Sequence, residues 1–305
     1  MSSVMENNNN ETRRVLLWST PRSASTTFLK SMSNLENGVF WHEPYTQAFK
    51  FGSTKSSRRL ARKGKTSKPS DVPGKNTDEG GFVYDASKIT LTWVKHELER
   101  ESEEKSLVLV KEIINGSLED YYEWIPGGYH HTFLIRHPHR ICMSLMGLLQ
   151  DVKSKKIKAD LERKIPQQLQ SFSKMCDLLE YIKVHHDEKP LIIDCDDLLS
   201  NPIGIMQAYC KDIGVQFVPD ILHWETGDAV MKNRWFVSKQ NIATYKAGKL
   251  YESSFASTGF QQPSDLPLRL DLPDELLPLV DSQMPYYEQL YEQAIKCYMY
   301  TPLKE

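Results

Sequence analysis

Short, largely apolar runs recur along the chain and are separated by segments with a different apolar spacing. The runs cover residues 15–18, 38–41, 107–110, 131–135 and 190–193. Such runs are typical of strands that are buried on both faces of a parallel sheet. The intervening segments, of which 169–182 is the longest, place apolar residues every three or four positions, as an amphipathic helix does. This alternation of strand and helix predicts an α/β fold.

The first of these strands leads into a loop that suits an anion. Pro21 ends the strand, because proline has no N–H to donate and disfavours a helical residue before it. Arg22 adds a fixed positive charge, and helical apolar spacing begins at Phe28. The hydroxyl-bearing residues between them are Ser23, Ser25, Thr26 and Thr27. A strand, a tight loop and a helix N-terminus present free N–H groups and the helix dipole to a phosphate, although an ordinary surface turn with capping hydroxyls is the alternative.

A pair of polar residues, His42 and Glu43, follows the second predicted strand. Pro44 ends this strand and places the pair at its carboxyl end, the edge where open α/β sheets hold their ligands. A histidine beside a glutamate at this edge favours a role in catalysis, and a polar strand terminus is the alternative. Alternation along the strand points the two side chains to opposite faces, so only one of them should face a cleft.

Basic residues follow the third and fourth predicted strands at the same edge. Lys111 comes directly after the third strand, and Arg136 comes directly after the fourth. Pro138 suits the first turn of a helix, which places Ser144 about two turns into that helix.

The composition fits a globular protein whose anion site is local. At 305 residues the chain can bury the core of a single domain, which we expect at 13–305. The net charge of -2 argues against nucleic acid or an acidic membrane as a partner. No apolar run approaches the length of a membrane span, and residues 1–10 are too polar for a signal peptide. Together with the scattered cysteines, these features predict reduced thiols and a cytoplasmic location.

Two segments are expected to lie outside the core. Residues 1–12, which include four consecutive asparagines, are predicted to be a disordered tail. Residues 50–81 are rich in Lys, Arg, Ser and Gly and poor in apolar residues. They are predicted to form a flexible basic insertion, either disordered or a lid over an anionic ligand.

Two motifs resemble those of sulfotransferases that use 3′-phosphoadenosine 5′-phosphosulfate (PAPS). Residues 21–26, PRSAST, resemble the family's 5′-phosphosulfate loop, Pro-[Lys/Arg]-Ser-Gly-[Ser/Thr]-Thr. Ala24 stands where the family has glycine, and the match requires that the backbone there keeps a negative φ. Residues 134–145, LIRHPHRICMSL, resemble the family's 3′-phosphate motif, Arg-x-Pro-x-x-x-x-x-Ser. The resemblance covers about two-thirds of the chain, which lacks the Walker A spacing G-x-x-x-x-G-K-[ST].

The resemblance implies a P-loop-like sulfotransferase fold, in which three α/β/α layers surround a central parallel sheet of about five strands. It also implies transfer of a sulfuryl group from PAPS to a hydroxyl or amine of a small molecule, with release of adenosine 3′,5′-bisphosphate (PAP) and no metal. By this resemblance Arg136 and Ser144 bind the 3′-phosphate, and Lys111 shares with Arg22 the charge on the leaving group. The expected contacts of the 5′ group are Arg22, Ser23, Ala24, Ser25, Thr26 and Thr27.

The general base departs from the pattern of the cytosolic enzymes, which have Lys-x-His after the third strand. This chain has Lys111-Glu112-Ile113 there. Some relatives use a glutamate after the second strand, and Glu43 occupies that position. Glu43 would need burial to raise its pKa, whereas His42, the second candidate, has a suitable ordinary pKa.

Two other functions stay open at this point. One is a PAP- or nucleotide-binding module without turnover, and the other is a P-loop kinase that acts on a small alcohol. The acceptor and the oligomeric state are not readable from the sequence. Residues 224–260 should shape the acceptor pocket. The resemblance implies that this segment also crosses the nucleotide, with Arg234, Lys239, Lys246 and Lys249 as possible phosphate contacts.

Overall fold

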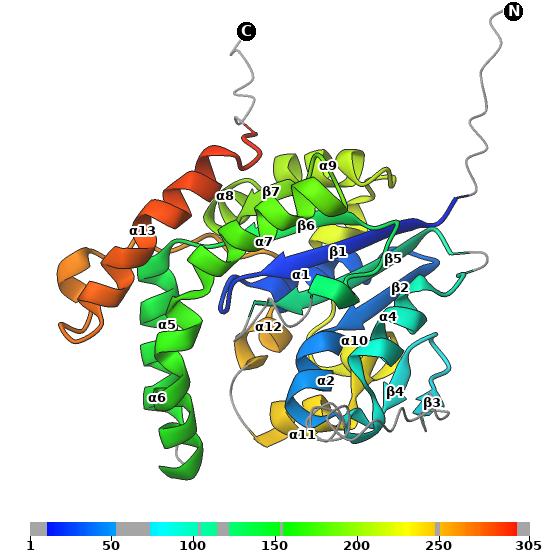
Figure 1. Cartoon of the computed structure of the whole chain (residues 1–305), viewed down its shortest axis with the longest axis horizontal. Helices are drawn as coiled ribbons and strands as arrows, with labels where there is room; N and C mark the ends of the chain where they lie inside the picture. The colour runs from blue at the N-terminus through cyan, green and yellow to red at the C-terminus, as the bar shows by residue number, and fades with distance from the viewer. Residues whose placement is uncertain are drawn as a thin grey trace, which may run out of the picture.

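The protein is described from a computed structural model that covers residues 11–52, 74–102, 105–114, 122–152, 155–247 and 251–297. Within these residues the sheet has eight strands in the order β3-β4-β8-β2-β5-β1-β6-β7 (Figure 1). All neighbouring strands run parallel except β3 and β4. An α/β fold with a largely parallel sheet is therefore confirmed.

The predicted apolar runs all form strands. They are β1 (Arg13–Ser19), β2 (Gly38–His42), β5 (Leu107–Ile113), β6 (His130–Ile135) and β7 (Leu191–Asp194). The expected count of about five was too low, because β3 (Gly74–Asn76), β4 (Phe82–Tyr84) and β8 (Trp235–Ser238) extend the sheet beyond β2. These three strands have three or four residues each, too few to show a period in the sequence.

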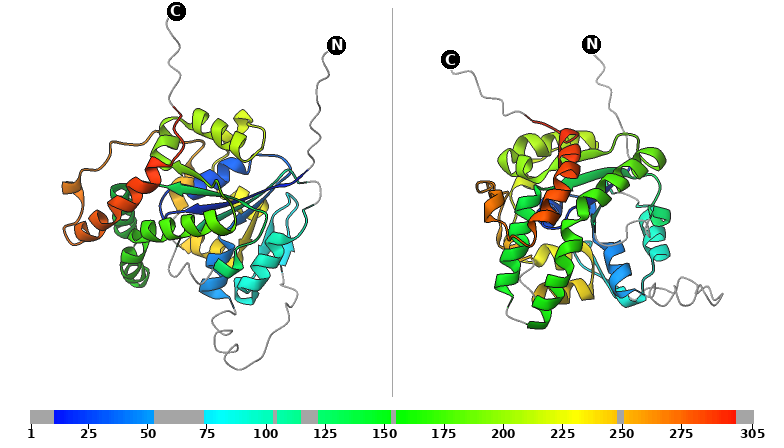
Figure 2. Two further views of the ribbon diagram at one scale, coloured as in Figure 1. Left: turned by 45° about the horizontal axis from the view of Figure 1, so that its top comes forward. Right: turned by 60° about the vertical axis from the view of Figure 1, so that its left-hand side comes forward.

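Helices cover both faces of the sheet, which makes the three layers (Figure 2). One face carries α1 (Ser25–Met32), α8 (Cys195–Ser200), α9 (Pro202–Asp212) and α10 (Ala229–Asn233). The other face carries α2 (Pro44–Phe51), α4 (Leu91–Glu99), α5 (Pro138–Asp151), α7 (Ser171–His185) and α13 (Leu277–Glu292). The remaining α-helices are α6 (Lys155–Leu169), α11 (Lys239–Ala247) and α12 (Glu252–Ala256).

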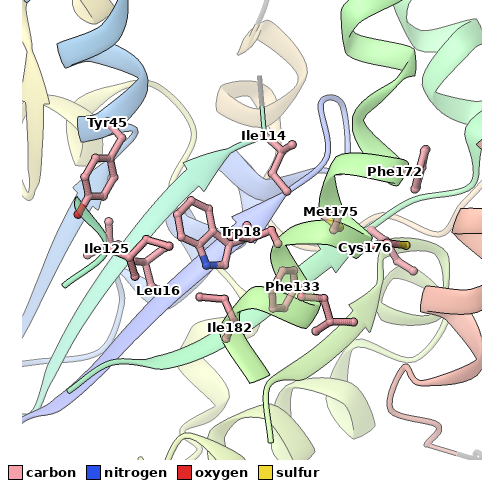
Figure 3. Packing of buried hydrophobic residues seen from close by; sticks show 14 of the residues in the cluster. Leu16, Trp18, Tyr45, Ile114, Ile125, Phe133, Phe172, Met175, Cys176 and Ile182 are labelled. Atoms are coloured by element: carbon pink, nitrogen blue, oxygen red, sulfur yellow. The ribbon is translucent and has the colours of Figure 1, made fainter. Parts of the chain in front are cut away.

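The side chains of the central strand β1 pack alternately against the helices on the two faces of the sheet. Leu16 and Trp18 point into the cluster beneath α7, where they pack with residues such as Phe133 and Ile182 (Figure 3). Their neighbours, which include Val15, point into the opposite cluster against α1 and α9. Because both faces of β1 are buried at residues 15–18, this part of the strand has no exposed position, and its sequence is a continuous apolar run.

Several expectations concern residues that the structure describes only partly. Residues 1–10 and 53–73, which make up most of the expected tail and basic insertion, lie outside the described residues. In the described part of the chain, no helix has both the length and the apolar character needed to cross a membrane.

Candidate functional site

A cavity of about 1330 Å³ opens at the carboxyl ends of β1, β2, β5 and β6. Its lining includes residues 21–27, the first part of α2, one face of α6, and residues of α11 and α12. Of the predicted site residues, Glu43, Lys111, Arg136 and Ser144 also line it. A smaller cavity of about 600 Å³ lies at the β3 edge of the sheet, and Lys239 is the one predicted residue among those that line it.

The loop between β1 and α1 has an unusual backbone. Ala24 is the N-cap residue of α1 and has a φ of 59°, so the expected negative φ is wrong. Arg22 also has a positive φ, of 61°. Two left-handed residues turn the chain sharply between strand and helix, and the Ser23 hydroxyl donates to the carbonyl of Thr20 to close the turn. Ala24 has no side chain that can cap α1. The first N–H groups of this helix, whose residues line the cavity, are therefore not used by a capping side chain and can bind an anion.

The two predicted phosphate motifs meet in space. Nε of Arg22 donates to Oγ of Ser144 at 3.0 Å, and Nη1 of Arg136 donates to the carbonyl of Arg22 at 2.9 Å. Nε of Arg136 is buried and has no hydrogen-bond partner among the described residues, with a carboxylate oxygen of Asp196 3.8 Å away. Burial lowers the pKa of Arg22, and the charge of Arg136 lowers it further, against the opposite effect of Tyr251. The guanidinium groups of Arg22 and Arg136, both on this cavity, favour the binding of an anion.

Glu43 and Lys111 form a buried ion pair across neighbouring strands. Nζ of Lys111 lies 2.5 Å from Oε1 of Glu43, and the two side chains are 1% and 2% exposed. Burial raises the pKa of Glu43, but the charges of Lys111, His42 and Lys50 outweigh it and lower the pKa to about 2. Burial of Glu43 is found, but the net rise in pKa that a base at this position was expected to need is not, because Lys111 contacts the carboxylate.

His42 does not line the cavity, which argues against His42 as the general base. Its ring stacks on Trp235 with 5.3 Å between centroids, and the Tyr245 hydroxyl lies 2.8 Å from its Nε2. Asn241 donates an amide N–H to Nδ1 at 3.0 Å. Burial lowers the pKa of His42 to about 3, although Glu43 acts in the opposite direction. His42 is thus a neutral buried residue, but its Nε2 lies 3.8 Å from Oε1 of Glu43. The expectation that the two side chains point to opposite faces is therefore wrong, because β2 ends at His42 and the left-handed φ of Glu43 turns the chain there.

Glu112 has a structural role that the sequence does not reveal. Its carboxylate accepts from the backbone N–H of Tyr45 at 2.8 Å, of Thr46 at 3.3 Å and of Ile113 at 2.9 Å. The first two of these donors belong to the first turn of α2, so Glu112 caps that helix from the neighbouring strand. Burial and the charge of Glu43 raise the pKa of Glu112 to about 7.

This cap explains why Glu43 can face the cavity. Glu43 is the N-cap residue of α2, yet its side chain makes no capping hydrogen bond. Its φ of 53° turns the chain at that point. Because Glu112 satisfies the helix donors, the carboxylate of Glu43 is available to Lys111 and to a ligand.

The segment 224–260 places fewer charged side chains at the larger cavity than expected. Arg234 contacts the carbonyl of Leu35, and Lys239 lines the smaller cavity. The side chain of Lys246 and the whole of Lys249 lie outside the described residues. The segment instead brings Tyr251 and Ser254 to the cavity, and the hydroxyl of Ser254 accepts from Thr27 at 3.0 Å. Tyrosine and serine carry no charge, so nothing in their sequence pattern marked them as site residues.

No group of three His, Cys, Asp or Glu side chains in the described part of the chain is arranged to hold a metal ion.

Residues 98–294 match the family model of the sulfotransferase domain. The match covers more than half of the chain, which therefore belongs to the sulfotransferase family. The matched range contains Lys111, Arg136 and Ser144 and begins after the loop at 21–27 and Glu43.

Among curated proteins, the chain is similar to branched-chain-amino-acid aminotransferase-like protein 2 of Arabidopsis thaliana, with 24% identity over 267 residues. That alignment covers 86% of this chain and 40% of the plant protein, so the chain spans well under half of that relative's length.

Three solved structures share low sequence identity with the chain. A sulfotransferase domain from the curacin biosynthetic pathway is 16% identical, with a TM-score of 0.46. The alignment covers 91% of this chain and 99% of that domain. The corresponding domain of the Synechococcus PCC 7002 olefin synthase is 15% identical with a TM-score of 0.45, and covers 92% and 98%. A mouse sulfotransferase complexed with PAP is 9% identical with a TM-score of 0.42, and covers 92% and 83%.

Proposed function

We propose that this protein transfers a sulfuryl group from PAPS to a hydroxyl or amine of a small-molecule acceptor and releases PAP. One observation carries the proposal beyond family membership. The loop at 22–27 and the Arg136–Ser144 motif lie on one cavity, joined by the hydrogen bond from Arg22 to Ser144. A nucleotide with phosphates at both its 5′ and 3′ positions would use both motifs at once.

The donor is held by charge and by backbone N–H groups. The N–H groups of Ser25, Thr26 and Thr27 at the start of α1, together with Arg22, bind the 5′-phosphosulfate. Arg136 and Ser144, which both line the cavity, bind the 3′-phosphate. Tyr251, which lines the same cavity, lies where it can pack against the nucleotide.

The transfer requires one bond to form as another breaks. The acceptor oxygen or nitrogen bonds to sulfur, the bond from sulfur to the bridging oxygen of PAPS breaks, and the acceptor loses a proton. Negative charge grows on the bridging oxygen, so cations that contact it lower the barrier. Arg22 and Lys111 are the cations on this part of the cavity wall.

Glu43 takes the acceptor's proton. In the ion pair it is held ionised, which is the form that can accept a proton, but its low pKa makes it a weak base. As charge grows on the leaving group, Lys111 moves toward the bridging oxygen and away from Glu43. The pKa of Glu43 then rises at the step where a stronger base is needed.

Incubation of the full chain with PAPS and a panel of phenols, sterols, sugars and amines tests this function. The expected result is PAP release together with a sulfated product, identified by its mass. Arg22→Ala should lower both PAPS affinity and turnover, because its contact strengthens as the leaving group gains charge. PAP binding without PAP release would instead indicate a binding module, and phosphate transfer from ATP would indicate a kinase.

A further inference from the structure

The cavity continues beyond Glu43 into a region whose walls carry charged and amide side chains among apolar ones. One wall is the last part of α2, and the other is α6, which projects beyond the sheet on the same side as α2 and α11 (Figure 1). Gln167 and Gln168 of α6 line this region, and Thr244 of α11 lies on its border. The aromatic residues there are Phe49 and Phe51. The charged side chains that line the region are Lys50, Asp160, Arg163 and Lys164.

Positive charge exceeds negative charge on these walls. Asp160 accepts from Nη2 of Arg163 at 2.6 Å and also from Lys164, so one carboxylate serves two cations. Lys50, on the opposite wall, makes no ion pair with any described residue. Among the described residues that line this region, positive charge therefore exceeds negative charge.

Lys50 lies between the reaction centre and α6. Its charge is one of those that lower the pKa of Glu43 against the effect of burial, after Lys111 and His42. Lys50 is exposed, yet the protein atoms around it lower its pKa. The charge of Glu43 opposes this shift, and the charge of Lys164 adds to it. Two cations that face each other across a cavity repel, and an anion between them would relieve that repulsion.

We infer that the acceptor carries an anionic group, which binds between Lys50 and Lys164 while the hydroxyl or amine that receives the sulfuryl group lies at Glu43. The inference rests on the proposed function, because it names the acceptor class of the same site. The amides of Gln167 and Gln168 suit the hydroxyl groups of a polar acceptor such as a sugar acid or a sugar phosphate. A carboxylate and a phosphate ester share the chemistry that the two lysines recognise.

Matched pairs of probes test this inference by calorimetric titration of the full chain saturated with PAP, which fills the other anion sites. Methyl β-glucuronide and methyl β-glucoside differ in a carboxylate, and glucose 6-phosphate and glucose differ in a phosphate. We expect the anionic member of at least one pair to bind about 10-fold more tightly, with the difference falling as salt is raised. The pair with the larger difference identifies the anionic group.

The double variant Lys50→Gln with Lys164→Gln should remove this preference. Lys158→Gln is the matched control, because Lys158 lies on α6, is exposed and does not line the cavity. Melting temperatures of the variants check that the fold is intact. Equal binding of both members in both pairs, including no binding by any of them, would overturn the inference, as would a preference that survives in the double variant.

The test separates this inference from the proposed function. If PAP binds and PAPS is turned over with a neutral acceptor alone, the proposed function stands and the anionic acceptor is wrong. If PAP does not bind, the proposed function fails, and the difference between the double variant and Lys158→Gln still reports whether the two lysines hold an anion.

Discussion

Lys111 Nζ lies 2.5 Å from Oε1 of Glu43, and the two residues come from neighbouring parallel strands. In the register of β2 and β5, His42 lies opposite Lys111, and the N–H of Glu43 donates to the carbonyl of Lys111 at 2.8 Å. This pairing places the side chain of Glu43 next to that of Lys111. A proposed base and a proposed charge-stabilising cation are thus paired before any ligand binds.

The roles of Glu43 and His42 can be separated by turnover. We predict that Glu43→Gln abolishes turnover at saturating PAPS, because the amide cannot accept the acceptor's proton. His42→Ala should cost far less turnover, since His42 does not line the cavity. PAP affinity, measured in parallel, should be retained in Glu43→Gln. The reverse ranking would move the role to His42, and similar activity in both variants would place the base outside this motif.

The same ion pair predicts an acid-sensitive fold. The folded pKa of Glu43, about 2, lies below its ordinary value of 4.5, so its contribution to stability is present above pH 4.5 and is lost as the pH falls toward 2. The shift corresponds to about 3 kcal/mol of the free energy of unfolding. Urea denaturation from pH 5 to pH 2 should show a steeper loss of stability for the natural chain than for Glu43→Gln. Parallel curves for the two proteins would contradict this effect.

Glu112 is predicted to position Glu43 without contacting the ligand. In Glu112→Gln the amide oxygen can still accept from the N–H groups of α2, but the NH2 group then lies against the N–H of Ile113, so the free energy of unfolding should fall by about 2 kcal/mol. Because α2 begins directly after Glu43, kcat should fall more than PAP affinity. Asp85→Asn is a matched control, since Asp85 caps residues 86–88 away from the cavity and should change stability but not kcat. An unchanged kcat in Glu112→Gln would contradict the positioning role.

Ala24→Gly is predicted to stabilise the protein. An L-residue at a φ of 59° is strained by roughly 1–2 kcal/mol, and the entropy that glycine adds to the unfolded chain offsets part of the gain. Chemical denaturation should therefore show an increase of up to about 1 kcal/mol in the free energy of unfolding. Ala229→Gly, at the start of α10, should give no such increase. A loss of stability in Ala24→Gly would contradict the left-handed backbone at this position.

The sequence predicted those strands whose burial leaves a run of apolar residues in the chain. The apolar runs identified the central strands because both faces of those strands are buried. Strand β8 gave no signal, because Trp235–Ser238 is too short for periodicity and pairs with β2 from far along the chain. Residues 21–27, Glu43, Lys111, Arg136 and Ser144 were placed at one sheet edge by their positions after strands, and all of them line one cavity.

What the sequence did not predict depends on pairs of residues that are distant along the chain. Glu112 caps a helix that begins 68 positions earlier at Pro44, and no local pattern relates the two. The low pKa of Glu43 follows from Lys111, whose contact arises only from strand pairing. The left-handed conformation of Ala24 was missed because residue type alone favoured a negative φ.

The central claim is that the two motifs bind one nucleotide through both its 5′ and its 3′ groups. Calorimetric titration of the full chain with PAP and with AMP, which lacks the 3′-phosphate, tests it most directly. We predict that PAP binds at least about 10-fold more tightly than AMP, and that Arg136→Ala removes this difference. Equal affinities for PAP and AMP in the natural chain, or a preference for PAP that survives in Arg136→Ala, would contradict the account.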